Sequence, residues 1–178
     1  MSKISPLAFI DPEAKIGENC EIGPFCFIDK NVEIGDNNVL MNSVSVLYGA
    51  RIGNGNVIFP GAVISAVPQD LKFQGEDTTA EVGDNNKIRE NVTINRGTAA
   101  KGKTCVGSGN LLMESVHVAH DAFVGNDCII GNGTKLAGEI IIDDHAIISA
   151  NVLMHQFCRV GGFHLILYVH ASRLPIAV

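Results

Sequence analysis

Tryptophan is absent from the 178-residue chain, and aromatic residues make up only 6% of it. The hydrophobic core is therefore expected to consist of aliphatic side chains. Basic residues are also few, with 13 Lys and Arg against 19 Asp and Glu, which leaves a formal net charge of −6. Nucleic-acid-binding proteins normally present a basic surface, so this charge argues against that class of partner.

Long hydrophobic runs are missing as well. No segment is long and apolar enough to span a bilayer, and the N-terminal residues do not form a signal-peptide pattern. The sequence therefore predicts a cytoplasmic protein without stable membrane insertion. Its length suits a single domain with a continuous core.

Aliphatic residues recur at every sixth position along most of the chain. A six-residue period sustained in this way is typical of a parallel β-helix, and no stretch shows the 3.6-residue period of an amphipathic helix. We therefore expect an all-β fold with almost no helix. The repeating positions are Ile4, Ile10, Ile16, Ile22, Ile28, Ile34, Leu40, Val46, Ile52, Ile58, Ile64, Val82, Ile88, Ile94, Val106, Leu112, Val118, Val124, Ile130, Leu136, Ile142, Ile148, Met154 and Val160.

The repeat also fixes which residues stack on one another. Three repeats are expected to close one coil, so residues 18 apart lie in neighbouring coils at about the 4.8 Å spacing of paired strands. A second inward position, usually small, comes four residues after each aliphatic one, and cysteines there are expected to be buried and reduced. The cysteines in this second position are Cys20, Cys26, Cys128 and Cys158.

The repeat is interrupted twice, at about 65–81 and at about 95–105. Insertions in solenoid proteins form protruding surface loops, often on the binding face. The periodicity alone leaves open whether these two loops are functional or merely tolerated.

Two histidines, His117 and His120, flank the inward residue Val118 and are expected to lie on the outside of the helix. The stacking rule places His120 beside Gly138 and, one coil further, Gln156. It also places Asp121 beside Glu139, and His155 two coils above Ala119. An imidazole base, an orienting carboxylate and an unshielded glycine N–H could together activate a hydroxyl and stabilise an oxyanion. The competing interpretation is a set of surface histidines on a polar face.

Several motifs within this frame resemble those of the bacterial acyl-acyl carrier protein:UDP-N-acetylglucosamine O-acyltransferases, the first enzymes of lipid A synthesis. The resemblance covers residues 1 to about 162. It is carried by Gln69-Asp70-Leu71-Lys72, Ile94-Asn95-Arg96-Gly97-Thr98, Asn110-Leu111-Leu112-Met113, His117-Val118-Ala119-His120-Asp121, Leu136-Ala137-Gly138 and His155-Gln156-Phe157-Cys158.

The resemblance implies a left-handed parallel β-helix that forms a homotrimer with active sites between subunits. It implies transfer of an (R)-3-hydroxyacyl group from acyl carrier protein to the 3-hydroxyl of UDP-N-acetylglucosamine, with neither a metal nor a cofactor. His120 matches the catalytic base, Asp121 the residue that orients it, and Gly138 the oxyanion-binding N–H. The matching substrate-binding positions are Gln69, Asp70, Lys72, His117, His155 and Gln156.

The chain departs from the family pattern at three places. Glu139 and Asn95 stand where the family commonly has histidine, and residues 163–178 do not continue its Gly-rich coils and C-terminal helical region. We therefore expect a β-helix acyltransferase domain over 1–162, an aberrant or truncated tail over 163–178, and reduced turnover.

The same sequence features allow three alternatives. The related N-acyltransferase usually carries an N-terminal uridine-binding domain, for which repeats beginning at Ile4 leave no room. A γ-carbonic-anhydrase-like zinc enzyme would need three converging histidines. The candidate ligands are His117, His120 and His155. Their spacing differs from the spacing of the zinc histidines in that family, and no histidine precedes His117. A non-catalytic trimeric scaffold remains open.

Overall fold

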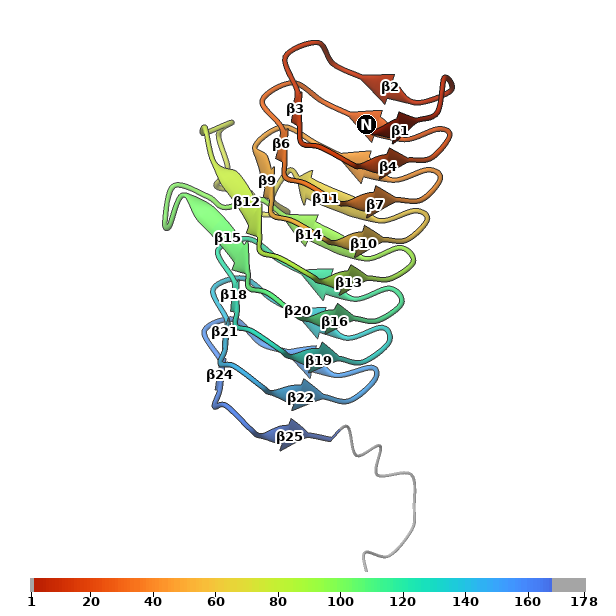
Figure 1. Cartoon of the computed structure of the whole chain (residues 1–178). Coiled ribbons are helices and arrows are strands. Elements are labelled where there is room, and N and C mark those ends of the chain that lie inside the picture. Colours follow the sequence, from red (N-terminus) through yellow and green to blue (C-terminus); the bar gives the residue numbers. More distant parts are fainter. Residues whose placement is uncertain (1, 168–178) are drawn as a thin grey trace, which may run out of the picture.

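A computed structural model of the chain describes residues 2–167. These residues form short β-strands and no helix, as the six-residue period predicts. The chain winds into a left-handed parallel β-helix in which each coil adds one strand to each of three sheets (Figure 1). Within residues 2–167 the strand pairs are parallel, and the coils stack as a column whose register shifts once, between Ile64 and Ala66.

Each of the three sheets consists of every third strand along the described column. The first sheet contains β1 (Lys3–Ile4), β4 (Glu21–Ile22), β7 (Val39–Leu40), β10 (Val57–Ile58), β13 (Lys87–Ile88), β16 (Leu111–Leu112), β19 (Ile129–Ile130), β22 (Ile147–Ile148) and β25 (Leu165–Ile166). The second contains β2 (Phe9–Ile10), β5 (Phe27–Ile28), β8 (Ser45–Val46), β11 (Val63–Ala66), β14 (Thr93–Asn95), β17 (His117–Val118), β20 (Lys135–Leu136) and β23 (Leu153–Met154). The third contains β3 (Lys15–Ile16), β6 (Glu33–Ile34), β9 (Ala50–Ile52), β12 (Thr79–Val82), β15 (Lys103–Val106), β18 (Phe123–Val124), β21 (Ile141–Ile142) and β24 (Arg159–Val160).

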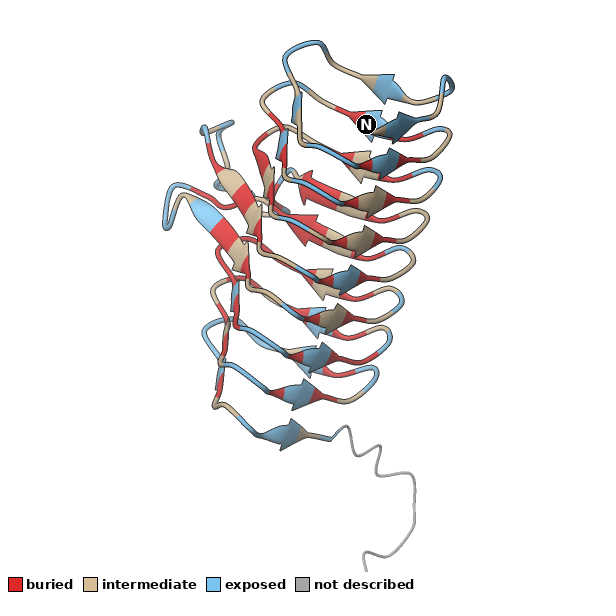
Figure 2. Cartoon of the chain, viewed as in Figure 1, coloured by how far each residue is buried: buried red, intermediate tan, exposed pale blue. Residues whose placement is uncertain are grey.

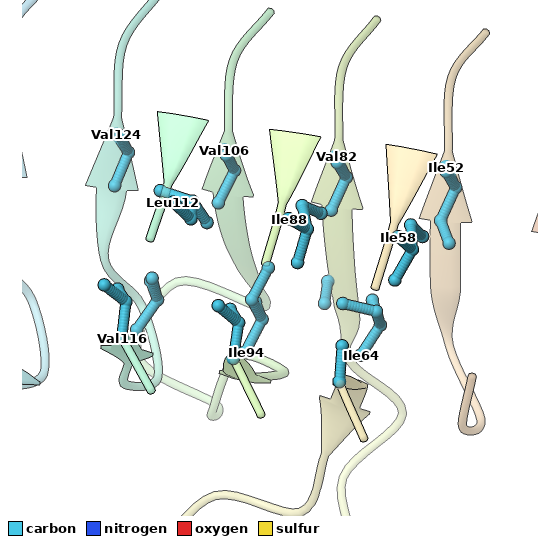
Figure 3. Close-up of a cluster of buried hydrophobic side chains, with 14 of the residues drawn as sticks. Ile52, Ile58, Ile64, Val82, Ile88, Ile94, Val106, Leu112, Val116 and Val124 are labelled. Carbon is cyan, nitrogen blue, oxygen red and sulfur yellow. The ribbon is translucent and has the colours of Figure 1, made fainter. Parts of the chain in front are cut away.

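The core is a set of aliphatic columns along the helix axis. Ile58, Ile88 and Leu112 stack in one column, and each is wholly buried (Figure 3). Buried residues run along the inside of the middle coils, whereas exposure increases at both ends (Figure 2). This packing supplies the apolar burial that stabilises strands only two residues long.

Two inward positions differ from the sequence expectation. Ile4 lies in the edge strand β1, where no coil covers it on the outer side, and it is half-exposed. Cys158 is exposed, because it lies in the last coil that the structure describes in full, whereas Cys20, Cys26 and Cys128 are buried as predicted. None of the five cysteines forms a disulfide; all are free thiols.

Buried asparagines of successive coils form a hydrogen-bonded ladder, and the sequence separation between neighbours in the ladder gives the length of each insertion. The amide N–H of Asn56 donates to Asn38 Oδ1 across 18 residues, that of Asn86 to Asn56 Oδ1 across 30, and that of Asn110 to Asn86 Oδ1 across 24. The first insertion therefore adds 30 − 18 = 12 residues and the second adds 24 − 18 = 6. The ladder keeps its register across both insertions.

Both expected loops are present, but they are shorter than the sequence indicated. The first loop spans residues 67–78 between β11 and β12, and the second loop spans residues 96–102 between β14 and β15. The strands reach into the expected loop ranges because residues on both sides of each loop still pair with neighbouring coils. The loops project side by side near β12 and β15 (Figure 1).

The columns make core truncation costly. We expect Leu112→Ala to lower the free energy of unfolding by about 2–5 kcal/mol, because it leaves a cavity between fixed coils. The same change at the fully exposed Leu71 should alter it by no more than about 0.5 kcal/mol. Chemical denaturation of both variants tests this, and equal effects would contradict an aliphatic column as the source of stability.

Candidate active site

His120 and Asp121 form a buried pair at the corner that follows β17. Their side chains are joined by a 2.8 Å hydrogen bond between His120 Nδ1 and Asp121 Oδ2. His120 is 7% exposed and Asp121 is 1% exposed. Because Nδ1 faces a carboxylate, the proton of a neutral imidazole resides there and Nε2 is left as the free base.

The sequence placed His120 on the outside of the β-helix but did not predict its burial. His120 does lie outside the aliphatic columns, but it is buried between the neighbouring coils and the residues that surround the cavity described below. The corner itself requires unusual backbone geometry, since Asp121 has a φ of 59°. Aspartate and asparagine tolerate this left-handed conformation better than most residues, which suits Asp121 to the position.

Thr98, in the second loop, holds the Asp121 carboxylate from the other side. Its backbone N–H donates to Oδ1 over 2.9 Å and its hydroxyl donates to Oδ2 over 2.6 Å. The Asp121 N–H in turn donates to Thr104 Oγ1 over 2.8 Å. Sequence reasoning placed Thr98 in a motif but gave it no role, because its partner lies in another coil.

These contacts decide the charge of Asp121. Burial alone would raise the pKa of the carboxyl group, but the hydrogen bonds from Thr98 and His120 outweigh it and hold the pKa below its usual range. Asp121 is therefore ionised at neutral pH and can orient His120 and stabilise its protonated form.

Gly138 lies against the His120 ring in the next coil. A Cβ atom at this position would lie 2.7 Å from His120 Nε2 and 3.2 Å from Gln156 Nε2. Only glycine therefore allows the imidazole to occupy this place. Within residues 2–167, the Gly138 N–H donates to no protein acceptor, so it is available to a bound group.

A second histidine, His117, lies on β17 and is half-buried. Its Nδ1 atom is 2.7 Å from Thr93 Oγ1. Burial, followed by the nearby charges of Lys135 and His120, lowers the pKa of His117. This imidazole is therefore neutral at neutral pH and can offer one hydrogen bond beyond the one with Thr93.

A cavity of about 290 Å³ opens beside these residues. It brings together five of the residues expected from the sequence, and its remaining walls are mainly apolar. The lining residues are Gln69, His117, Ala119, His120, Lys135, Leu136, Ala137, Gly138, Leu153, Met154 and Gln156. Gln69 reaches the cavity from the first loop, whereas the others come from the coils.

Four expected site residues do not line this cavity, and one of them is Asp121, which is buried and hydrogen-bonded to His120. Asp70 and Lys72 lie in the first loop, where the Lys72 N–H donates to Asp70 Oδ1 over 2.9 Å. His155 is exposed directly after β23, near the end of the described column. Its Nδ1 atom is 3.4 Å from the carbonyl oxygen of Gln156.

Glu139, which stands where the related family commonly has histidine, lies behind the pair. Its N–H donates to the His120 carbonyl oxygen over 3.0 Å, and its carboxylate is 3.9 Å from Lys101 Nζ of the second loop. Lys101 Nζ also lies 3.3 Å from the Asp121 carbonyl oxygen. The position therefore joins the second loop to the His120 corner.

The described residues 2–167 contain no group of three His, Cys, Asp or Glu side chains arranged to hold a metal ion. His117 and His120 each use Nδ1 in a contact within the protein, and His155 does not line the cavity that contains them. A larger hollow of about 540 Å³ over the third sheet is lined by Arg51, Glu81 and Cys105 among others, but it contains no histidine. In the same range no helix is long and apolar enough to cross a membrane.

The chain is similar in sequence and in structure to proteins named UDP-N-acetylglucosamine acyltransferases. It is 46% identical over 162 residues to the acyl-[acyl-carrier-protein]–UDP-N-acetylglucosamine O-acyltransferase of Aliarcobacter butzleri, a match that covers 90% of this chain and 62% of that protein. The crystal structure of a UDP-N-acetylglucosamine acyltransferase from Bacteroides fragilis matches with 74% identity and a TM-score of 0.89, covering 91% of this chain and 64% of that one. No protein-family model matches the chain.

A further crystal structure of a UDP-N-acetylglucosamine acyltransferase is 36% identical with a TM-score of 0.79, and the match covers 90% of this chain and 71% of that one. The chain thus spans somewhat less than two thirds of the two relatives described first.

The ionised state of Asp121 predicts a specific loss of stability in acid. Because its pKa is lower in the folded than in the unfolded chain, its contribution is present above the ordinary value of 3.8 and is lost as the pH falls through the folded value. Asp121→Asn should therefore reduce the free energy of unfolding by about 1–3 kcal/mol at neutral pH. It should also flatten the acid dependence measured by denaturation at several pH values.

Asp127→Asn is the matched control, because Asp127 has a similar φ of 54° but an exposed side chain. It should leave the acid profile unchanged. An Asp121→Asn variant with the acid profile of the original chain would contradict the hydrogen-bonded, ionised carboxylate.

Proposed function

The chain belongs to the UDP-N-acetylglucosamine acyltransferase family, and from this membership we propose that it transfers an (R)-3-hydroxyacyl group from acyl carrier protein to the 3-hydroxyl of UDP-N-acetylglucosamine. This reaction is the first step of lipid A synthesis. The observation that carries the proposal is the buried His120–Asp121 pair, whose free Nε2 atom faces Gly138 at the wall of a cavity.

The proposed chemistry is a direct transfer with His120 as general base. Nε2 takes the proton of the sugar hydroxyl while the hydroxyl oxygen attacks the carbonyl carbon of the acyl thioester. Asp121 stabilises the imidazolium that forms. Collapse of the tetrahedral intermediate breaks the carbon–sulfur bond, and the departing thiolate takes the proton back from His120.

Gly138 is the proposed oxyanion donor. Its N–H has no protein acceptor within residues 2–167 and lies in the coil next to His120. A preorganised N–H of this kind stabilises the negative charge of a tetrahedral intermediate far better than it stabilises the thioester itself. No cysteine lines the cavity, which favours direct attack over an acyl-enzyme.

The remaining candidates are proposed as substrate contacts. Gln69, His117 and Gln156 line the cavity and can bind polar groups of the sugar or the acyl chain. Asp70 and Lys72 in the first loop, and His155 on its turn, are placed to meet parts of the substrates that extend beyond the cavity.

We also propose a homotrimer that works in the cytoplasm. An outward-facing strip of exposed apolar side chains on the first sheet, formed by Ile129, Ile147 and Leu165, supports association, since soluble proteins rarely leave such strips uncovered. Five free thiols support a reducing compartment.

The trimer makes a simple prediction about mass. Analytical ultracentrifugation should give a species of three times 18.9 kDa, or about 57 kDa. A species of one chain mass at micromolar concentration would contradict the trimer, while leaving the chemistry of the site to be judged by activity.

The transferase activity is tested by incubating the purified chain with UDP-N-acetylglucosamine and (R)-3-hydroxyacyl carrier proteins of several chain lengths, and following thiol release. His120→Ala should lower the rate by about 10²- to 10⁴-fold, because the general base is lost. Gly138→Ala should also lower it strongly, because the added Cβ displaces the imidazole. Release independent of the sugar nucleotide, or unchanged in His120→Ala, would contradict the mechanism. No release from a folded chain would favour a scaffold.

A further inference from the structure

The hydrogen bonds within the first loop do not by themselves fix its position on the β-helix. It leaves the coils after β11, spans residues 67–78 and delivers Gln69 to the cavity. Its internal hydrogen bonds are local, for example from the Phe73 N–H to the Asp70 carbonyl oxygen over 3.0 Å. Local bonds of this type shape a turn but do not fix its place relative to the helix. The loop therefore needs contacts from outside itself.

Asn95, the last residue of β14, and Arg96, the first residue of the second loop, hold the beginning of the first loop. The Arg96 N–H donates to the Ala66 carbonyl oxygen over 2.9 Å, and Asn95 Nδ2 donates to the Val67 carbonyl oxygen over 3.0 Å. Val67 is only two residues before Gln69. Asn95 is 2% exposed and thus provides a fixed anchor.

Gly97, which follows Arg96, holds the end of the first loop. Its carbonyl oxygen accepts a 2.7 Å hydrogen bond from Thr78 Oγ1, and its N–H donates to the Thr79 carbonyl oxygen over 3.0 Å. A Cβ atom at Gly97 would collide with the backbone of Lys103, so this close approach requires glycine.

The Arg96 side chain contacts the middle of the first loop. Its guanidinium carbon lies 5.2 Å from the ring centroid of Phe73 and 5.6 Å from that of Tyr48, which lies two coils earlier in the same stack. Among residues 2–167, Arg96 forms no ion pair with a carboxylate, and its Nε atom is buried without a partner. A planar cation in contact with one ring of the loop and one ring of the coils can hold the loop against the β-helix.

Residues 95–98 also contact the His120–Asp121 pair, because Thr98 donates two hydrogen bonds to the Asp121 carboxylate. Residues 95–98 thus contact the first loop at its beginning, middle and end, and then contact the proposed catalytic carboxylate. A displacement of this segment would move Gln69 and Asp121 together.

We propose that Arg96 is a positioning residue that holds the first loop through Phe73 and thereby keeps Gln69 in the cavity. The catalytic part of this inference rests on the proposed acyltransferase function, whereas the structural part does not. Arg96 does not line the cavity, so its effect on the reaction is indirect and passes through the loop.

Hydrogen exchange tests the structural part without any need for activity. Arg96→Met should raise the exchange rate of the Phe73 amide by at least about tenfold, because the loop opens locally more often. Arg96→Lys keeps the charge but loses the planar contact and should give an intermediate rate. Phe73→Leu removes the ring that the Arg96 guanidinium contacts, and it should raise the exchange rate of the amide at position 73 as much as Arg96→Met does.

Arg89→Met is the matched control. Arg89 lies 4.4 Å from the ring centroid of Phe59, but it borders the first sheet and pairs with Glu90, away from the first loop. It should leave exchange at Phe73 unchanged. Equal exchange at Phe73 in the original chain and in Arg96→Met would overturn the proposal, and so would an equal effect of Arg89→Met.

A double-mutant cycle tests the catalytic part. Arg96→Met should lower kcat/KM by about ten- to a hundredfold, the scale expected for misplacement of a substrate-positioning group. Added to Gln69→Ala, it should lower kcat/KM little further, since both changes remove the same interaction. Additive losses would mean that Arg96 affects the reaction by a route other than Gln69 and would overturn the proposal. An inactive original chain would count against the proposed function, while the exchange experiment would still decide the role of Arg96.

Discussion

The parallel pairing of Val118 with Leu136 sets the distance between the two halves of the site. His120 follows β17 by two residues and Gly138 follows β20 by two residues, so one coil spacing brings the imidazole against the glycine. That spacing is fixed because the inward side chains of both strands belong to continuous buried columns. Any slip in register would separate the base from the N–H and would also expose the core.

The loops add what the regular coils cannot provide. A perfect solenoid presents only outward side chains from short strands, with no enclosed space for a substrate. The second loop reaches back to hold Asp121 through Thr98, and the first loop reaches over to add Gln69 to the cavity. The chain thus combines a rigid frame that fixes His120 and Gly138 with inserted segments that complete the wall and orient the carboxylate.

The regular part of this arrangement could be predicted from the sequence. His120, Gly138 and Gln156 are separated by whole coils without an insertion, so simple spacing placed them together correctly. Thr98 and Arg96 could not be placed in the same way, because their partners lie across insertions whose path the six-residue period does not encode. The six-residue period placed His120 outside the aliphatic columns but does not encode its burial, and the exposure of Cys158 reflects its place near the end of the described column. The aberrant or truncated tail expected over residues 163–178 remains a prediction, and residues 168–178 lie outside the described residues.

The central claim is that His120 Nε2 and the Gly138 N–H face one reacting group in the cavity. A crystal structure of the chain with UDP-N-acetylglucosamine bound tests it most directly. We expect the sugar 3-hydroxyl to lie within about 2.6–3.2 Å of His120 Nε2, on the side where Gly138 lies. A sugar bound outside the cavity, or one with its 3-hydroxyl turned away from His120, would contradict it.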